Sequence, residues 1–380
     1  MWIKRNKMLL KRVLLLLVII LLVGGLAASG CTARGNVPRG WSGGTIADGT
    51  LFLASMEGKL VAVDVSDGSR QWEPVTLEAT ASGGGFGCAP KSKAVAIYGN
   101  LAVGGNLFYV GGYDGKIYAF NSISGALRWV YPRQGELQPI VGGPVVASGK
   151  VYIGCSDGKL YALDAVTGDY QWEFQTGDKI WSTPAINGET VYIGAFDKKL
   201  YALDANSGSK KWEFEAEGAI VATPLISNNT IYIGSFDRYF YAIDATDGSL
   251  NWKFMAENWF WAKAVIYDNT VYAACLDGKV YALDAKSGDK LAEIDLESPV
   301  SSSPVVVGDL IVVASEEGGV YSIYTSNNRK RELLDLEARI DAPLGASQGV
   351  VYVHTQEHET LHALDVQAGV VLWTLPLTSK

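Results

Sequence analysis

The sequence predicts an all-β fold, an eight-bladed β-propeller of four-stranded antiparallel blades joined by tryptophan-docking motifs. Three observations support this fold class. One motif returns about every 40 residues, a strand–turn–strand pattern occurs eight times, and no segment has the 3.6-residue period of a helix. A four-stranded blade cannot bury both faces alone, and a radial arrangement lets each blade cover the next.

The repeated motif is clearest at 162–172, where its skeleton is Ala-x-Asp-x-x-Thr-Gly-x-x-x-Trp. We interpret it as a clip between blades: the glycine allows a tight turn whose flat peptide faces an indole, and the tryptophan is buried against the adjoining blade. In the sixth unit Ala292 replaces the tryptophan, and the seventh unit, around 311–331, has lost the motif. The predicted docking residues are Trp72, Trp129, Trp172, Trp212, Trp252 and Trp373.

Each hairpin consists of two alternating, β-branched and aromatic runs around a turn that is Asp-Gly in its clearest copies. After the strand with the tryptophan, a further strand opens with small residues and proline, as at Thr183-Pro184, which fits an innermost strand crowded around an axis. The first spacing between tryptophans is longer than the others, which indicates an insertion within 73–97. The eight hairpins are predicted at 51–64, 107–121, 151–164, 191–204, 231–244, 271–284, 311–324 and 351–365.

The N-terminus has the pattern of a targeting segment. Basic residues precede an apolar run from Val13 to Val23, and small residues then lead to Cys31. This ending resembles a bacterial lipobox, which implies cleavage before Cys31 and a lipid on its thiol. An uncleaved anchor and an ordinary signal peptide are the alternatives, and all three place residues 32–380 outside the cytoplasm. We therefore divide the chain into a signal segment (1–30), a tether (31–40) and the propeller (41–380).

Charge and cysteine content exclude several function classes. The chain has 32 basic and 40 acidic residues, and the first thirty residues hold five of the basic ones and no acid. The rest of the chain is therefore strongly acidic and repels phosphate backbones, which argues against nucleic-acid binding. Beyond Cys31 the cysteines are Cys88, Cys155 and Cys275, without a CxxC or an adjacent pair, which argues against a disulfide framework and a cysteine-rich metal site.

The eleven-residue skeleton resembles the docking motif of the eight-bladed quinoprotein propellers, the PQQ-binding-like repeat family. The resemblance covers nearly all of 41–380 and, with the lipobox, extends to lipoprotein scaffolds of the outer-membrane protein assembly machinery. It implies a non-catalytic, membrane-anchored scaffold for envelope proteins or client polypeptides, with no cofactor and no metal. One alternative is a propeller that binds PQQ or another small ligand, including a dehydrogenase, although the adjacent cysteine pair typical of those enzymes is absent. The other is a propeller that binds carbohydrate or cell wall.

His358-Glu359-Thr-Leu-His362 matches the HExxH pattern of zinc proteases, which needs both histidines one turn apart on a helix. Here the stretch aligns with the hairpin of the eighth unit, where that geometry fails. All three histidines of the chain, His354 included, lie in this hairpin. We therefore predict neither a catalytic residue nor a metal site there.

A departure from the repeat consensus gives the candidate binding site. Where other units read Ile180-Trp-Ser-Thr-Pro184, the sixth has consecutive aromatics followed by a lysine. Blade-to-blade loops and hairpin turns lie on one face of a propeller, so these side chains would gather at the channel mouth, where exposed aromatics beside a cation form a binding hot spot. The alternative is that they plug the channel as core. The candidate partner- or ligand-binding residues are Trp181, Trp259, Phe260, Trp261 and Lys263.

Overall fold

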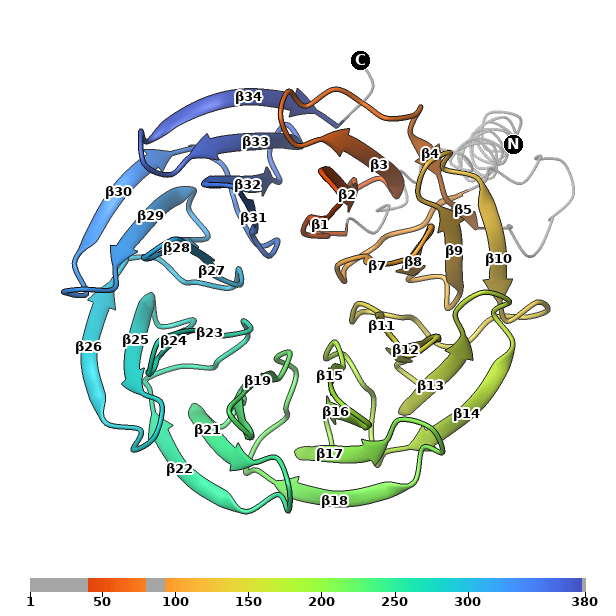
Figure 1. Ribbon diagram of the computed structural model, residues 1–380, viewed down its shortest axis with the longest axis horizontal. Coiled ribbons are helices and arrows are strands. Elements are labelled where there is room, and N and C mark those ends of the chain that lie inside the picture. The colour runs from red at the N-terminus through yellow and green to blue at the C-terminus, as the bar shows by residue number, and fades with distance from the viewer. Residues whose placement is uncertain (1–39, 80–92, 378–380) are drawn as a thin grey trace, which may run out of the picture. The chain divides into compact units, whose positions relative to one another are not determined.

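The computed structural model describes residues 40–79 and 93–377. Eight four-stranded antiparallel sheets stand around a common axis, as Figure 1 shows, which confirms the predicted fold class. The signal segment, Cys31 and most of the tether lie outside the described residues, as does Cys88. Within the described ranges, no helix has the length and hydropathy needed to cross a membrane.

Each blade takes its four strands from consecutive residues, with the innermost strand first. The innermost strands are short: β1 (Thr45–Ala47), β7 (Ala102–Gly104), β11 (Val145–Ala147), β15 (Ala185–Asn187), β19 (Leu225–Ser227), β23 (Val265–Tyr267), β27 (Val305–Val307) and β31 (Gly345–Ser347). The second strands are β2 (Thr50–Ala54), β8 (Leu107–Gly111), β12 (Lys150–Gly154), β16 (Thr190–Gly194), β20 (Thr230–Gly234), β24 (Thr270–Ala274), β28 (Leu310–Ala314) and β32 (Val350–Thr355).

The third strands are β3 (Lys59–Asp64), β9 (Ile117–Asn121), β13 (Lys159–Asp164), β17 (Lys199–Asp204), β21 (Tyr239–Asp244), β25 (Lys279–Asp284), β29 (Gly319–Tyr324) and β33 (Thr360–Asp365). The outermost strands are β4 (Val75–Thr76), β10 (Leu127–Tyr131), β14 (Tyr170–Gln175), β18 (Lys210–Glu215), β22 (Leu250–Met255), β26 (Lys290–Asp295), β30 (Lys330–Asp335) and β34 (Val370–Pro376). The second and third strands occupy the eight predicted hairpins.

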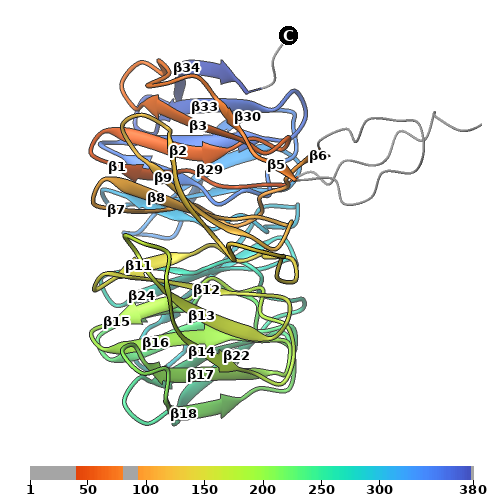
Figure 2. The same cartoon turned by 90° about the vertical axis from the view of Figure 1, so that its right-hand side faces the viewer.

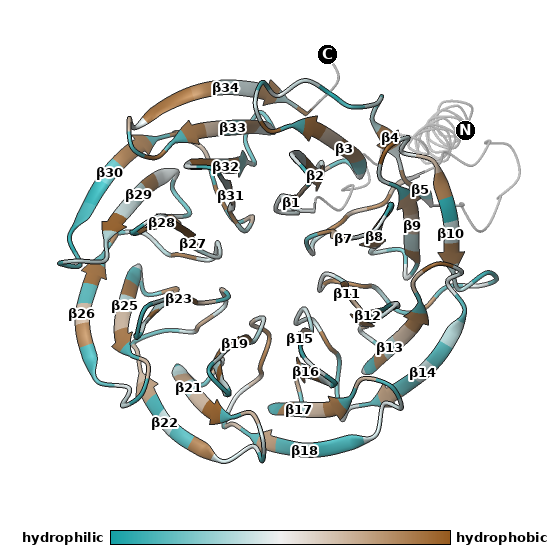
Figure 3. Ribbon diagram, viewed as in Figure 1, coloured by the Kyte–Doolittle hydropathy of each residue, from teal (hydrophilic) through white to brown (hydrophobic). Residues whose placement is uncertain are grey.

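Burial explains the difference between inner and outer strands. Second and third strands are covered on both faces by neighbouring blades, so they consist of apolar runs such as that of β17. Outermost strands alternate between the blade interface and solvent, and β18 accordingly reads Lys-Lys-Trp-Glu-Phe-Glu. Figure 3 shows this difference as hydrophilic segments along the outer strands. The apolar core is therefore a series of clusters between adjacent blades, such as the one joining Tyr192 and Ile231.

The predicted insertion contains a small extra sheet. β5 (Glu78–Ala79) pairs with β6 (Lys93–Ala94), separate from the blades. The residues between these strands lie outside the described part of the chain.

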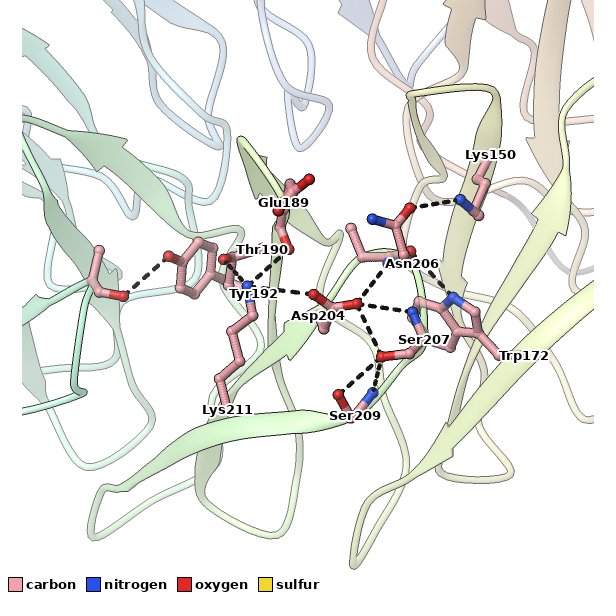
Figure 4. A network of polar contacts seen from close by, with 12 residues as sticks. Lys150, Trp172, Glu189, Thr190, Tyr192, Asp204, Asn206, Ser207, Ser209 and Lys211 are labelled. Carbon is pink, nitrogen blue, oxygen red and sulfur yellow. Dashed lines mark hydrogen bonds and ion pairs between the residues drawn. The ribbon is translucent and has the colours of Figure 1, made fainter.

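Every docking tryptophan contacts the following blade in the same way. Trp172 donates its indole N–H to the carbonyl of Ala205 at 3.2 Å, and a Cβ on Gly208 would lie 2.5 Å from the indole. Figure 4 shows this clip, in which the Asp204 carboxylate accepts hydrogen bonds from the turn at Asn206 and Ser207. The other five indole nitrogens donate to the equivalent carbonyls, those of Ser122, Ala165, Ala245, Ala285 and Val65.

The ring closes without a strand shared between its ends. Blade 1 (β1–β4) and blade 8 (β31–β34) are each complete, and they meet side by side (Figure 1). Trp373 donates to the carbonyl of Val65 at 3.3 Å, and the Tyr352 hydroxyl donates to the same carbonyl at 3.0 Å. Closure therefore uses the same clip as the other interfaces.

Candidate functional site: an aromatic collar at the channel mouth

Strand direction brings two sets of loops to one face. Seen from the rim (Figure 2), the strands run between the two faces of the ring. In every blade, the turn between the second and third strands and the segment before the innermost strand therefore lie on the same face. This face holds most of the residues that the sequence singled out.

A cavity of about 510 Å³ opens along the axis at this face, a volume typical of ligand pockets. One repeat position, the second residue of the segment that precedes each innermost strand, contributes a lining residue from every blade. Those eight residues are Trp41, Tyr98, Val141, Trp181, Val221, Trp261, Ser301 and Asp341. Half of them are aromatic, so the cavity wall offers flat apolar surfaces between polar groups.

Around blades 4 to 6 the aromatic side chains continue from the cavity onto the hairpin turns. We call Trp181, Phe196, Phe236, Trp259 and Trp261 the aromatic collar. Phe236 stacks with Trp259 at 4.6 Å and with Trp261 at 5.6 Å between ring centroids, and it contacts Phe196 edge-on at 6.2 Å. Phe196 meets Trp181 edge-on at 4.8 Å. Of the five, Trp259 is 45% exposed, so a large flat ring faces solvent at the mouth.

A cation and a hydrogen bond fix one end of the collar. The Lys179 ammonium lies 4.6 Å from the Trp181 ring centroid and 4.3 Å from that of Phe196, a cation–π arrangement. The Trp181 indole donates to Ser156 Oγ at 3.1 Å. Trp181 is therefore held in place, whereas the outer surface of Trp259 is open.

A second, smaller aromatic group lies across the mouth on blades 1 and 2. Trp41 contacts Tyr98 edge-on at 4.5 Å, and Tyr98 contacts Tyr113 edge-on at 5.3 Å. Tyr113 is 41% exposed.

Lys263 lies beside the collar and lines the cavity. Its backbone N–H donates to Ser303 Oγ of blade 7 at 3.1 Å. Its side chain is exposed to solvent, while the channel walls partly desolvate the ammonium group and lower the pKa of Lys263 below its ordinary value.

Phe260 corrects the sequence-based prediction, because it is not part of the exposed site. Its side chain is fully buried, packing on Phe240 at 5.3 Å and near Tyr281. The physical reason is strand-like alternation: Phe260 occupies the core position that Ile180 holds in blade 4, while Trp259 and Trp261 point to the other side.

Blades 7 and 8 present charged rather than aromatic groups at the mouth. Arg339 pairs with Glu316 at 2.8 Å and with Asp341 at 2.8 Å, and its backbone N–H donates to Glu357. Ser301 Oγ also donates to Asp341 at 3.0 Å. Asp341, the acidic residue among those that line the cavity, is thus already paired.

The hairpin-turn aspartates have structural partners. Asp197 accepts hydrogen bonds from the Tyr201 hydroxyl at 2.6 Å and the Gly177 N–H at 2.6 Å. Burial, followed by the Asp197 hydrogen bond, raises the pKa of Tyr201 above its ordinary value. The same bond from a tyrosine four residues on recurs at Asp114, Asp157, Asp237 and Asp277. These carboxylates hold their turns together, and this accounts for them without a binding role.

The HExxH stretch, residues 358–362, lies on the turn between β32 and β33 and on the start of β33. His358 and Glu359 are turn residues with positive φ, and His362 belongs to β33. The Glu359 carboxylate accepts a hydrogen bond from the Met56 N–H of blade 1, so it is an inter-blade contact. Within the described ranges, no three His, Cys, Asp or Glu side chains are grouped so that they could hold a metal ion.

Cys155 and Cys275 are buried free thiols. Burial raises the pKa of both thiols to about 12, so neither is a reactive thiolate.

Sequence reasoning missed Phe196 and Phe236 of the collar, and it missed Trp41, Tyr98 and Tyr113 across the mouth. Phe196 and Phe236 begin hairpin turns, and Trp41 opens blade 1 before any recognisable repeat. An alignment of the repeats position by position identifies Trp41, because it occupies the same repeat position as Trp181 and Trp261. Within a single repeat unit, nothing shows that this position is aromatic in half of the blades.

Comparison with known proteins agrees with this architecture. A family model described as "Beta-alanine-activating enzyme, beta-propeller" matches residues 139–334, and one described as "Outer membrane protein assembly factor BamB" matches residues 30–196. No curated protein matches the chain.

Solved structures that share the fold include a bacterial protein and a designed one. The crystal structure of BamB from Moraxella catarrhalis superposes with a TM-score of 0.67 at 20% identity, covering 83% of this chain and 91% of that one. The computationally designed Ika8 protein superposes with a TM-score of 0.70 at 15% identity, covering 86% and 96%. Because the first family model spans just over half of the sequence, the chain belongs to the β-propeller family which that model describes, and its repeats make it a PQQ-like propeller resembling BamB.

Proposed function

We propose that this propeller is a non-catalytic, extracytoplasmic scaffold that binds envelope proteins or client polypeptides and assists membrane-protein assembly. The observation that carries the proposal is the aromatic collar. An exposed tryptophan, Trp259, stacked on half-buried aromatic rings near a lysine has the composition of a protein-binding hot spot. The match to the assembly-factor family and the N-terminal segment that ends at Cys31 point to the same compartment and task.

Photo-crosslinking in the native envelope tests this proposal. A photoreactive amino acid replaces Trp259 in the collar or, as a matched control, Val166, which is exposed in a turn of the opposite face. We expect crosslinks to membrane-protein assembly components or client chains from position 259 and not from 166. Equal crosslinking from both positions, or none from 259, would contradict a docking role for the collar.

The lipid anchor is part of the same proposal. Cys31 is its attachment point, so a Cys31→Ser variant should lose both the incorporation of radiolabelled palmitate and the cleavage before residue 31, since both need the thiol. An unmodified protein that incorporates no palmitate and keeps residues 1–30 would instead indicate an uncleaved anchor.

The cavity makes a quinone- or small-ligand-binding propeller the second candidate, since its volume would hold such a molecule. Its lining does not fit PQQ with calcium: Asp341 is committed to Arg339, and the two described cysteines are buried singly. Adding PQQ and calcium and following an artificial electron acceptor separates the two functions, because turnover would overturn the scaffold proposal.

A further inference from the structure

Lys263 is exceptional at its repeat position, the fourth residue of the segment that lines the channel. The other blades place small or uncharged residues there: Gly43, Asn100, Gly143, Thr183, Thr223, Ser303 and Pro343. Only blade 6 has a charged side chain at this position.

The usual role of this position does not explain a lysine. Several of these residues form hydrogen bonds between neighbouring blades: the Gly43 N–H donates to Asn100 Oδ1 at 2.9 Å, and the Gly143 N–H donates to Thr183 Oγ1 at 2.8 Å. An ammonium group has no acceptor, so the side chain of Lys263 cannot take part in this way. Its backbone N–H alone makes the bond to Ser303.

The lysine charge has no partner within the described ranges of the chain. No described carboxylate pairs with its ammonium group, and the surrounding walls partly desolvate it. Asp341 lines the same cavity, but Arg339 and Ser301 satisfy it. The Lys263 side chain is exposed at the mouth, so an incoming anion can reach this unpaired cation and accept a charge-assisted hydrogen bond from it.

The position of the collar indicates the size of what binds. Trp181, Trp261 and Lys263 line the cavity, whereas Trp259 lies outside the cavity lining and remains 45% exposed. A small molecule confined to the cavity would leave Trp259 uncovered. An extended chain that enters the mouth over the collar would cover both Trp259 and the residues that line the cavity.

We propose that the channel mouth binds an extended segment of a partner polypeptide, with an acidic side chain of that segment at Lys263 and an adjacent apolar side chain on Trp259 and Trp261. This inference rests on the proposed scaffold function and specifies the chemistry of the partner. Charge complementarity selects the acidic residue, and the stacked rings select its apolar neighbour.

The test uses two capped ten-residue peptides that differ at one position, Asp or Asn between two phenylalanines, titrated at low salt into the full propeller. We expect the Asp peptide to bind about tenfold tighter, as one charge-assisted hydrogen bond allows. Lys263→Met should remove this preference and leave affinity for the Asn peptide unchanged. The control variant is Lys286→Met, which changes an exposed lysine in a turn of the opposite face and should keep the preference for the Asp peptide. Trp259→Ala should weaken the binding of both peptides to the same extent.

Equal affinity of the two peptides for the unmodified protein would overturn the inference, as would a preference that survives in Lys263→Met. Competition by free benzoate as strong as that of the Asp peptide would also overturn it, in favour of a small carboxylate ligand. If Trp259 still crosslinks to envelope partners in either case, only this inference fails. Loss of those crosslinks would remove the proposed function itself.

Discussion

At the scale of single residues, each interface depends on an indole, a glycine and a carbonyl. The indole of Trp172 packs flat on the turn at Gly208 while its N–H satisfies the Ala205 carbonyl. The Tyr152 hydroxyl donates to the same carbonyl at 2.9 Å, so one acceptor receives two bonds from the preceding blade. The clip therefore combines apolar burial with full use of a buried backbone oxygen.

Substitutions at Trp172 and Gly208 should not be additive. Trp172→Ala leaves a cavity and should lower the free energy of unfolding by about 3 kcal/mol. Gly208→Ala places a methyl group 2.5 Å from the indole at a φ of +73°, so it is destabilising for two reasons. In the double variant the methyl group added at position 208 no longer clashes with an indole, so the glycine substitution adds only its backbone cost. Urea denaturation of all four proteins measures this coupling, and strict additivity would show that the two residues do not contact in solution.

The tryptophan and glycine could be predicted because they stand at a fixed spacing in the sequence. The tyrosine could not, because a tyrosine on an apolar strand has the same pattern whether or not its hydroxyl reaches another blade. Phe260 was wrongly placed for a related reason. Three consecutive aromatics look like one patch in a sequence, whereas a strand-like backbone sends alternate residues to opposite sides.

At the scale of elements, blade 7 (β27–β30) differs from the others at both of its interfaces. On one side Ala292 replaces the tryptophan, and Asn328 replaces the glycine of the turn and accepts a hydrogen bond from the Tyr272 hydroxyl at 2.9 Å. On the other side Arg331 takes the place of the indole beside Gly369 and donates to the Gln367 carbonyl at 3.3 Å. The motif that seemed absent from the sequence of this unit is replaced by different polar contacts.

Restoring the indole should help at one side of blade 7 only. Arg331→Trp places the ring opposite Gly369, and we expect a gain of about 1 kcal/mol in unfolding free energy from the added apolar burial. Ala292→Trp faces Asn328, whose side chain occupies the space that glycine leaves elsewhere, so it should give no gain. Thermal unfolding of both variants measures the difference. A gain from Ala292→Trp as large as that from Arg331→Trp would show that the facing glycine is not what the tryptophan requires.

At the scale of the whole molecule, the contact between blades 8 and 1 completes the ring and contains a buried histidine. The ring of His354 lies 3.1 Å from the Ser42 carbonyl through Nδ1, while its Nε2 is buried without a partner among the described residues. Desolvation lowers the pKa of His354 below its ordinary value of 6.5, so the folded protein keeps the ring neutral. The tautomer with Nδ1–H satisfies the carbonyl.

Stability should therefore fall in mild acid. The unfolded chain takes up a proton on His354 as the pH drops through 6.5 and the folded chain does not, so the free energy of unfolding decreases there. Burial lowers the pKa of His362 and acts in the same direction, whereas burial raises the pKa of Glu359, which opposes the effect at lower pH.

The His354→Asn variant keeps a donor for the Ser42 carbonyl and cannot titrate. Between about pH 7 and 5 it should lose about 1 kcal/mol less unfolding free energy than the unmodified protein, as linkage requires. Chemical denaturation across this range measures the two slopes, and parallel slopes would contradict a neutral buried His354.

Closure by two complete blades also has a consequence for the order in which the protein is made. The N-terminal residues leave the ribosome first, and the apolar side of blade 1, with Leu51, Leu53 and Val63, packs against Tyr352 and Leu361 from the far end of the chain. That surface must stay uncovered until residues up to about 377 have been synthesised. A chain whose last blade has not yet formed therefore has one open apolar edge, the kind of surface that promotes aggregation.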